Sequence, residues 1–362
     1  MFRGKRDYLT GSPLRRFQAG VTARRTYLIR DPRRGLIVGH NGSPFVTAYD
    51  WVDDVGFGSK ATNPVTLPTN TSLSVAISPE GDYVAVAQTT SPFINVYVYS
   101  QEGGFGARSA NPASLPAGAN DHVVWNPTGD VISLTHQTTP FITAYPWSAG
   151  AFGTKYAAPA VTPGSTGNEI AWSPNGLFVG VATDSSPFVS VYQWVPGIGF
   201  GSKVANPSAL PPAQCIGISW SPDGRYLGLA HSGAPFVTVY NWSNTNGFGA
   251  KVTAPVSAPA GFCNGIAWSP SGADIAVASN TAPFILAWPW ANGFGTRYTN
   301  PVSLPPGLGK SVRWNPTGDY LALAHGATPF ITVYEWAAGF GDKVANPSTL
   351  PASTGNSVVW HL

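Results

Sequence analysis

The sequence predicts an all-β fold: a seven-bladed β-propeller that is closed by pairing of the C-terminal strand with N-terminal strands, plus a basic N-terminal arm. Two observations carry this prediction. A unit of about 48 residues recurs seven times, and the chain ends in a strand that lacks the rest of its unit. Repeats of this length are typical of propellers and solenoids, so they decide the fold before any single segment does.

A Pro-Phe pair marks each repeat. The pairs follow one another at steps of 48, 48, 47, 48, 48 and 46 residues, which is too regular for chance. They are Pro44-Phe45, Pro92-Phe93, Pro140-Phe141, Pro187-Phe188, Pro235-Phe236, Pro283-Phe284 and Pro329-Phe330. Each pair opens an alternating run, such as residues 236–242, in which neighbouring side chains point to opposite faces as in a β-strand.

Three further segments complete each unit. A Gly-Phe-Gly turn, as at residues 247–249, leads to a short outer strand. A proline-rich link such as residues 206–211 then leads to the next blade, because proline is excluded from the middle of a sheet. Residues 216–220 predict the innermost strand of that blade, and the turn at 221–224 connects it to a second strand over 226–231. Four short strands per unit are typical of a propeller blade.

The C-terminus is predicted to close the ring. Residues 357–360 form an innermost strand with no blade after it, and the other three strands of that blade are predicted near the N-terminus, from Leu36, Phe45 and Phe57 onward. A solenoid would instead need a capping repeat at each end. Pairing of the two ends therefore yields seven complete blades.

Two segments compete for the innermost place in this closing blade. Residues 27–30 (YLIR) also resemble an innermost strand, and residues 358–360 (VVW) are the preferred choice. Residues 1–30 are therefore predicted as a basic arm and residues 31–362 as the propeller.

The segment at 220–227 (WSPDGRYL) resembles the inner-strand signature of WD-repeat propellers, and residues 172–176 and 268–272 repeat it. The chain departs from that family because the closing Trp-Asp dipeptides are missing, so the family's His-Ser-Asp-Trp hydrogen-bond network is not carried over. The Pro-Phe and Gly-Phe-Gly repeat is also similar to propellers of tailed bacteriophages. These resemblances imply a rigid platform for partners and no common chemistry.

Basic residues concentrate at the N-terminus. The first 34 residues hold 10 of the 20 Lys and Arg residues, opposed only by Asp7 and Asp31. We expect this arm to dock on an acidic protein surface of an assembly, with a solvated tail and contact with nucleic-acid phosphates as alternatives. The candidate anchoring residues are Arg15, Arg16, Arg24, Arg25 and Arg30.

A polar residue ends the second strand of every blade, which predicts that seven polar side chains lie near one face. The candidate binding residues in it are His40, His136, His231 and His325. Histidine suits metal binding or pH sensing, but equivalent positions in different blades are expected to lie too far apart to share one ion. Hydrogen bonding inside each blade is the structural alternative. No metal site and no cofactor are predicted.

The sequence carries no catalytic signature. It has no HExxH, no phosphate-binding glycine loop before a helix and no Gly-x-Ser-x-Gly turn, and its repeats are uniform. We therefore predict a protein that is not an enzyme but a binding or structural scaffold, with a virion (tail or other particle) component anchored through the arm as the leading hypothesis. The alternatives are a glycan-binding, lectin-type propeller and a free cellular protein-interaction hub.

The expected partners are other proteins of an assembly, with a host surface glycan as a second option and nucleic acid as the least expected. No apolar stretch reaches the roughly 20 residues of a membrane helix, so no membrane insertion is expected. The charged residues 1–17 argue against a signal peptide. The expected location is the virion for a phage-encoded protein and the cytoplasm otherwise; the sequence specifies neither the binding face nor the copy number.

Overall fold

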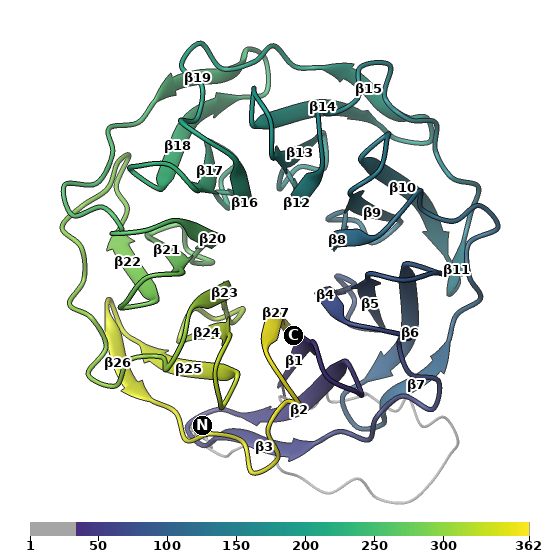
Figure 1. Ribbon diagram of the computed structural model, residues 1–362, viewed down its shortest axis with the longest axis vertical. Helices are drawn as coiled ribbons and strands as arrows, with labels where there is room; N and C mark the ends of the chain where they lie inside the picture. The colour runs from purple at the N-terminus through teal and green to yellow at the C-terminus, as the bar shows by residue number, and fades with distance from the viewer. Residues whose placement is uncertain (1–33, 362) are drawn as a thin grey trace, which may run out of the picture. The chain divides into compact units, whose positions relative to one another are not determined.

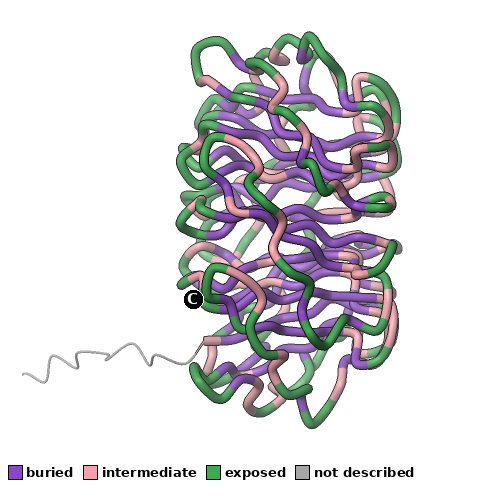
Figure 2. Tube along the Cα trace, turned by 90° about the vertical axis from the view of Figure 1, so that its left-hand side faces the viewer, coloured by how far each residue is buried: buried purple, intermediate pink, exposed green. Residues whose placement is uncertain are grey.

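The computed structural model describes residues 34–361 of the chain. Their regular secondary structure consists of β-strands in seven antiparallel sheets, six of four strands and one of three, which surround a central opening (Figure 1). The strands are largely buried and the connecting loops exposed (Figure 2). The predicted all-β, seven-bladed propeller is confirmed. No helix that could cross a membrane occurs within residues 34–361.

The sheets share one strand order, from the central opening outward. The innermost strands are β27 (Gly355–His361), β4 (Ser72–Ile77), β8 (Asn120–Trp125), β12 (Gly167–Trp172), β16 (Cys215–Trp220), β20 (Cys263–Trp268) and β23 (Gly309–Trp314). The second strands are β1 (Arg34–His40), β5 (Tyr83–Gln88), β9 (Val131–His136), β13 (Phe178–Thr183), β17 (Tyr226–His231), β21 (Asp274–Ser279) and β24 (Tyr320–His325).

The outer half of each sheet holds the Pro-Phe run and the Gly-Phe-Gly strand. The third strands are β2 (Val46–Val52), β6 (Ile94–Ser100), β10 (Ile142–Ser148), β14 (Val189–Val195), β18 (Val237–Ser243), β22 (Ile285–Pro289) and β25 (Ile331–Trp336). The outermost strands are β3 (Gly56–Lys60), β7 (Gly104–Arg108), β11 (Ala151–Phe152), β15 (Gly199–Lys203), β19 (Gly247–Lys251) and β26 (Phe340–Lys343).

The two ends of the described chain meet in one sheet of order β27-β1-β2-β3. Its innermost strand β27 pairs antiparallel with β1, so that Trp360 lies opposite Leu36 and Val358 opposite Val38. The C-terminal segment therefore takes the innermost place, as preferred from the sequence. The competing residues 27–30, like the rest of the predicted arm, lie outside the described residues.

Two blades depart from the four-strand prediction at their outer edge. The outer strand β11 has only two residues, and beside β22 there is a single bridge between Trp290 and Phe294. Both third strands carry a proline, Pro146 in β10 and Pro289 in β22. The next residue along each strand donates its N–H inward, so the N–H that proline lacks is one that would face the outer strand. The missing donor explains the weak outer pairing.

Side chains from neighbouring sheets interlock to form the core. Trp220 of one blade lies with its ring 4.7 Å from that of Trp242 at an angle of 87°, and Phe178 of the preceding blade contacts Trp242 at 5.2 Å. Edge-to-face pairs of this kind contribute about 0.5–1.5 kcal/mol each beyond their buried area. The indole N–H of Trp220 also donates to the carbonyl oxygen of Ala171 in the preceding blade, at 3.3 Å. Packing between blades thus fixes their positions around the ring.

A tyrosine in the third strand ties the proline-rich link to its blade. The hydroxyl of Tyr240 donates to the carbonyl oxygen of Ala209 at 2.6 Å, and the equivalent tyrosines of four other blades make the same contact at 2.6–2.9 Å. Tyr192 stands at this position too, but among residues 34–361 its hydroxyl has no bond to a link carbonyl. The tyrosines that do bond are Tyr49, Tyr97, Tyr145, Tyr240 and Tyr334.

This difference predicts the effect of removing one hydroxyl. Tyr240→Phe is expected to lower the free energy of unfolding by about 1 kcal/mol, because a buried hydrogen bond is lost. Tyr192→Phe is the matched control and is expected to change it by less than half as much. Urea unfolding followed by tryptophan fluorescence measures both. Equal losses in the two variants would show that the link contact is not what the hydroxyl of Tyr240 supplies.

Candidate active site

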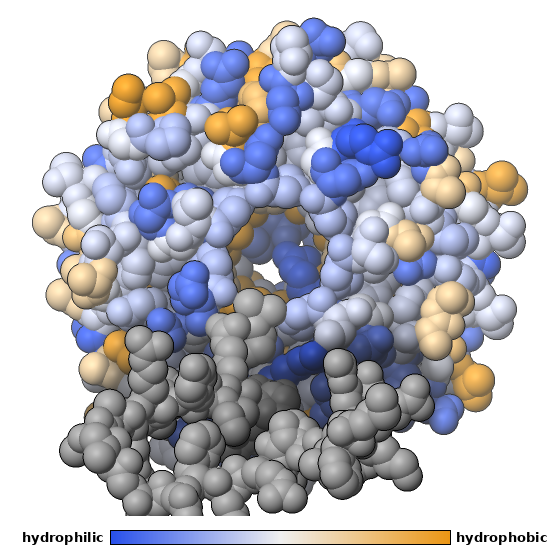
Figure 3. Space-filling view, turned by 180° about the vertical axis from the view of Figure 1, so that it is seen from behind, coloured by the Kyte–Doolittle hydropathy of each residue, from blue (hydrophilic) through white to orange (hydrophobic). Residues whose placement is uncertain are grey.

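The innermost strands line a channel through the propeller, and Figure 3 shows its opening. The seven strands align as one six-residue motif, so each position of the motif forms a ring of seven side chains. The second positions line a cavity of about 300 Å³ at one mouth; we name them the polar ring. They are Leu73, Asp121, Asn168, Ile216, Asn264, Lys310 and Asn356.

The fifth positions line the other half of the channel, which contains a cavity of about 360 Å³. We name them the apolar ring, since five of the seven are Ala or Val. They are Ala76, Val124, Ala171, Ser219, Ala267, Arg313 and Val359. Arg313 is the only charged member of this ring.

The third positions lie between the two rings. Five of them are small, namely Ser74, Gly217, Gly265, Ser311 and Ser357. The other two are His122 on β8 and Glu169 on β12, which line the cavities on both sides together with Arg313. His122, Glu169 and Arg313 therefore interrupt an otherwise repetitive channel wall at its middle.

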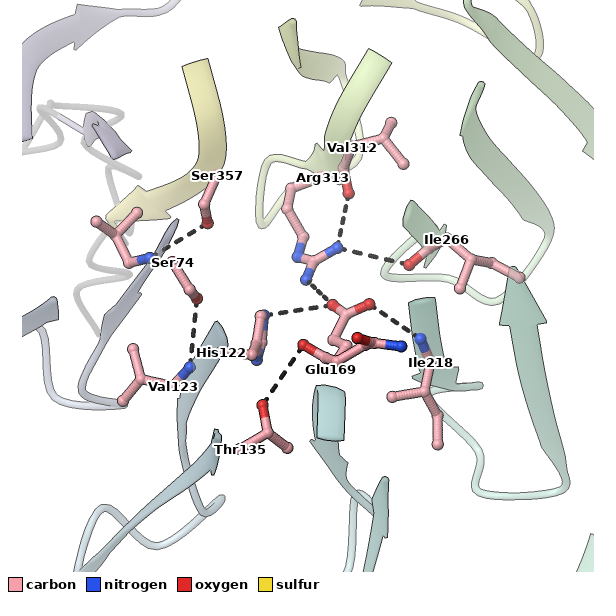
Figure 4. A network of polar contacts seen from close by, with 12 residues as sticks. Ser74, His122, Val123, Thr135, Glu169, Ile218, Ile266, Val312, Arg313 and Ser357 are labelled. Atoms are coloured by element: carbon pink, nitrogen blue, oxygen red, sulfur yellow. Dashed lines mark hydrogen bonds and ion pairs between the residues drawn. The ribbon is translucent and has the colours of Figure 1, made fainter. Parts of the chain in front are cut away.

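These three side chains meet in one cluster (Figure 4). The Oε1 atom of Glu169 lies 2.7 Å from Nη2 of Arg313 and 3.3 Å from Nε2 of His122. The Arg313 side chain reaches from β23 to Glu169 on β12, a residue 144 positions earlier in the sequence. The structure thus joins side chains from three blades, and we call them the channel cluster.

Glu169 is anchored by a bond that the repeat already uses. The Oγ of Ser74 accepts from the N–H of Val123 in the next blade at 3.4 Å, and the Oγ of Ser357 accepts from the N–H of Val75 at 3.2 Å. The Oε2 of Glu169 takes the same role and accepts from the N–H of Ile218 at 2.9 Å. One carboxylate oxygen therefore holds the side chain in place, and the other is directed at His122 and Arg313.

The contacts of Arg313 use only some of the N–H donors of its guanidinium group. Its Nη1 donates to the carbonyl oxygen of Val312 at 2.9 Å and lies 3.5 Å from that of Ile266, while Nη2 donates to Glu169. A guanidinium has five N–H donors, so two are left for another acceptor. With 30% of its side chain exposed, against 8% for Glu169, Arg313 is the cluster member most open to the channel.

His122 is held neutral by its surroundings. Burial lowers the pKa of His122 to about 4, and the positive charge of Arg313 acts in the same direction. The nearby Glu169 carboxylate raises the pKa but does not offset the loss of water. A neutral ring that faces a carboxylate through Nε2 carries its proton on that atom, because two acceptors would repel. The lone pair then lies on Nδ1, which is shielded from solvent and has no hydrogen-bond partner within residues 34–361.

The sequence matches no model of a protein family and no curated protein. Solved structures resemble it in fold. A candidate 6-phosphogluconolactonase from Bacteroides uniformis aligns with a TM-score of 0.69 at 15% identity, over 91% of this chain and 99% of that one. The periplasmic gluconolactonase of Pseudomonas aeruginosa gives a TM-score of 0.69 at 14% identity, over 91% and 99%. A functionally unknown protein from Desulfotomaculum acetoxidans gives 0.67 at 13%, over 90% and 98%. At these identities the likeness shows the fold alone.

The comparisons contradict the expectation of a non-enzymatic scaffold, because two of these three structures are described as lactonases, which are hydrolytic enzymes. The virion component, the lectin and the interaction hub fall with that expectation, and none of the three descriptions mentions WD repeats or a phage. The prediction took the uniformity of the repeat as evidence against a catalytic site. That inference failed because three substitutions in innermost strands suffice to build a polar cluster in the channel.

The histidines singled out from the sequence lie elsewhere. All four are fully buried in four separate blades, and each Nε2 lies 2.9–3.0 Å from the hydroxyl of a threonine seven residues later in the next strand. This is the hydrogen bonding inside each blade that was the structural alternative. The pairs are His40 with Thr47, His136 with Thr143, His231 with Thr238 and His325 with Thr332. Arg15, Arg16, Arg24, Arg25 and Arg30 lie outside the described residues.

The sequence did not predict the channel cluster, because its three residues lie in different repeats, on β8, β12 and β23. No local motif surrounds Glu169, His122 or Arg313. Aligning the seven innermost strands position by position would have exposed them as the only charged or titratable side chains at the third and fifth positions.

The buried histidines predict how stability depends on pH. Burial lowers the pKa of His40, His231 and His325 to about 4 from 6.5, so between these values the unfolded chain binds more protons than the folded one. Stability therefore falls as the pH drops from about 6.5 to 4.

The variant His325→Gln removes one such group, and glutamine already stands at the equivalent position as Gln88. It is expected to flatten the slope of unfolding free energy against pH by up to about 1.4 kcal/mol per pH unit. Urea unfolding at several pH values measures this slope, with Lys203→Met, on the outer strand β15, as the control. An unchanged slope in His325→Gln would refute the assignment.

Proposed function

We propose that this protein is a lactonase, which hydrolyses the ring ester of a lactone at the channel cluster. The observation that carries the proposal is the meeting of His122, Glu169 and Arg313 where the channel wall departs from its repeat. Neutral histidine, carboxylate and guanidinium are the groups that ester hydrolysis by general-base catalysis requires. The descriptions of two proteins that share the fold support the choice of a lactone among esters.

Glu169 acts as the base in this proposal, because Glu169 lines both cavities whereas Nδ1 of His122 is shielded from solvent. Its carboxylate takes a proton from water while the water oxygen bonds to the carbonyl carbon of the lactone. The Nε2–H group of His122, 3.3 Å from Oε1, orients this carboxylate.

Arg313 stabilises the negative charge that develops on the carbonyl oxygen. Two of its five N–H donors are not used by Val312, Ile266 and Glu169, so they can accept this charge. Collapse of the tetrahedral intermediate breaks the bond to the ring oxygen, which receives the proton back from Glu169. One water is consumed and an open-chain hydroxy acid results, so the reaction balances without another reactant.

Hydrolysis of δ-gluconolactone by the purified full-length protein, corrected for spontaneous hydrolysis, tests the proposal. We expect Glu169→Gln to lower kcat/KM by about 10²–10⁴-fold, since a positioned base contributes about that factor, and His122→Asn, which removes a group that orients the base, to lower it less. Arg313→Met should lower it by about 10²–10³-fold, as loss of one oxyanion donor does. Lys203→Met, on the outer strand β15 and outside the channel, should leave it unchanged.

The pH profile adds a second criterion. Because burial lowers the pKa of His122 to about 4, activity should persist at pH 5.5 and fall as the pH approaches that value, where a protonated ring beside Glu169 would weaken the carboxylate as a base. Thermal unfolding confirms that each variant is folded before its rate is compared. Native activity no greater than that of the His122→Asn and Glu169→Gln variants would rule out the channel cluster as the catalytic site.

A further inference from the structure

The two halves of the channel differ in chemistry on either side of the channel cluster. Beyond it, the apolar ring presents alanine, valine and one serine, and the cavity of about 360 Å³ there is also lined by Ile77, Pro79 and Pro127. A volume of this size is within the range of small-molecule sites. The lining of the space next to the reacting groups is therefore more apolar than polar, with Ser219 and Arg313 as the polar members of the apolar ring.

The one charge in the apolar ring, Arg313, also lines this cavity, but most of its donors are already paired. Arg313 is committed through Nη2 to Glu169 and through Nη1 to backbone carbonyls, in the direction of the third positions. Val359, Ala76, Val124 and Ala171 form a continuous apolar wall on the successive innermost strands β27, β4, β8 and β12. A substrate group that covers this wall removes apolar surface from water, which favours binding.

The polar ring, in contrast, offers few free donors to a sugar. The side-chain amide of Asn168 donates both to Asp184 and to the carbonyl oxygen of Cys215, each at 2.7 Å. That of Asn356 donates to Asn41 at 2.6 Å and to the carbonyl oxygen of Ser72 at 2.9 Å. These amides bridge neighbouring blades, so their N–H groups are already occupied and cannot read the hydroxyl pattern of a polyhydroxy lactone.

From these observations we infer that the substrate is a lactone with an apolar substituent on its ring, such as an alkyl or acyl chain, which lies against the apolar ring while the ester reacts at the channel cluster. The inference rests on the proposed function. It differs from the substrates named for the two lactonases of this fold, which are derivatives of gluconic acid. It identifies Val124, Ala171 and Val359 as residues that determine specificity and take no part in the chemistry.

A series of lactones with one ring and growing chains tests the inference on the full-length protein. The substrates are δ-valerolactone, δ-octalactone and δ-decalactone, with δ-gluconolactone as the polar comparison. Each methylene that becomes fully buried should raise kcat/KM about fourfold, so δ-decalactone should exceed δ-valerolactone by two orders of magnitude or more. δ-Gluconolactone should be the poorest of the four.

Variants of the apolar wall test where the alkyl chain of the substrate lies. Ala171→Leu should abolish most of the gain with chain length, so that the ratio of kcat/KM for δ-decalactone to kcat/KM for δ-valerolactone falls towards one. Val359→Phe, from the other side of the channel, should do the same if Ala171→Leu does not fold. Ala160→Leu, in an exposed link, is the matched control and should keep the native chain-length series.

The outcomes separate the two proposals. If δ-gluconolactone is hydrolysed by way of Glu169 but the rate does not rise with chain length, the inference is wrong and the proposed function stands. If the rate rises equally in Ala171→Leu and Val359→Phe, the chain lies elsewhere and the inference is also wrong. If native protein hydrolyses none of the four lactones, both fail. Binding of δ-decalactone to Glu169→Gln, measured by calorimetry, gives a readout independent of turnover: it should be weakened by adding Ala171→Leu.

Discussion

Pairing of β27 with β1 is the interaction on which the rest of the structure depends. Every other sheet is made from one continuous segment, but this sheet joins residues about 320 positions apart, from Leu36 opposite Trp360 to Val38 opposite Val358. Without it the first and last blades would each lack a neighbour, and apolar residues such as Trp51 and Val333, which share one core cluster, would be exposed to water. The channel exists because the ring is closed, so the site depends on a contact far from it in sequence.

Within this ring, the site uses a bond that the scaffold had already provided. At the third position of the innermost strand, a serine bridges to the backbone N–H of the next blade. Glutamate in the same place keeps that bridge and gains a second oxygen directed at the channel. Burial of a carboxylate is costly without partners, and Arg313 and His122 supply them. A symmetrical scaffold thus becomes chemically specific through few substitutions.

The fold could be predicted from the sequence almost completely, because strand alternation, turn residues and proline links repeat seven times. Where the prediction was incomplete the cause was local: Pro146 and Pro289 remove a donor that the outer strand needs. The site could not be predicted in the same way. Glu169 and Arg313 are 144 residues apart in the sequence, and they come into contact only because β12 and β23 face the same channel. His40 and its three equivalents drew attention as a regular pattern, and regularity in this protein marks structure: each bonds to a threonine of its own blade.

The difference between the two rings also gives the channel a direction. Under the proposed function, a neutral lactone with a hydrocarbon chain would approach along the apolar ring, whereas the hydroxy acid that hydrolysis produces is an anion at neutral pH. On the opposite side of the channel cluster stands Lys310, the one cation of the polar ring, at the mouth of the other cavity. Substrate and product would then travel through opposite ends of the same passage, and turnover would not require the entrance to be cleared before the next molecule arrives.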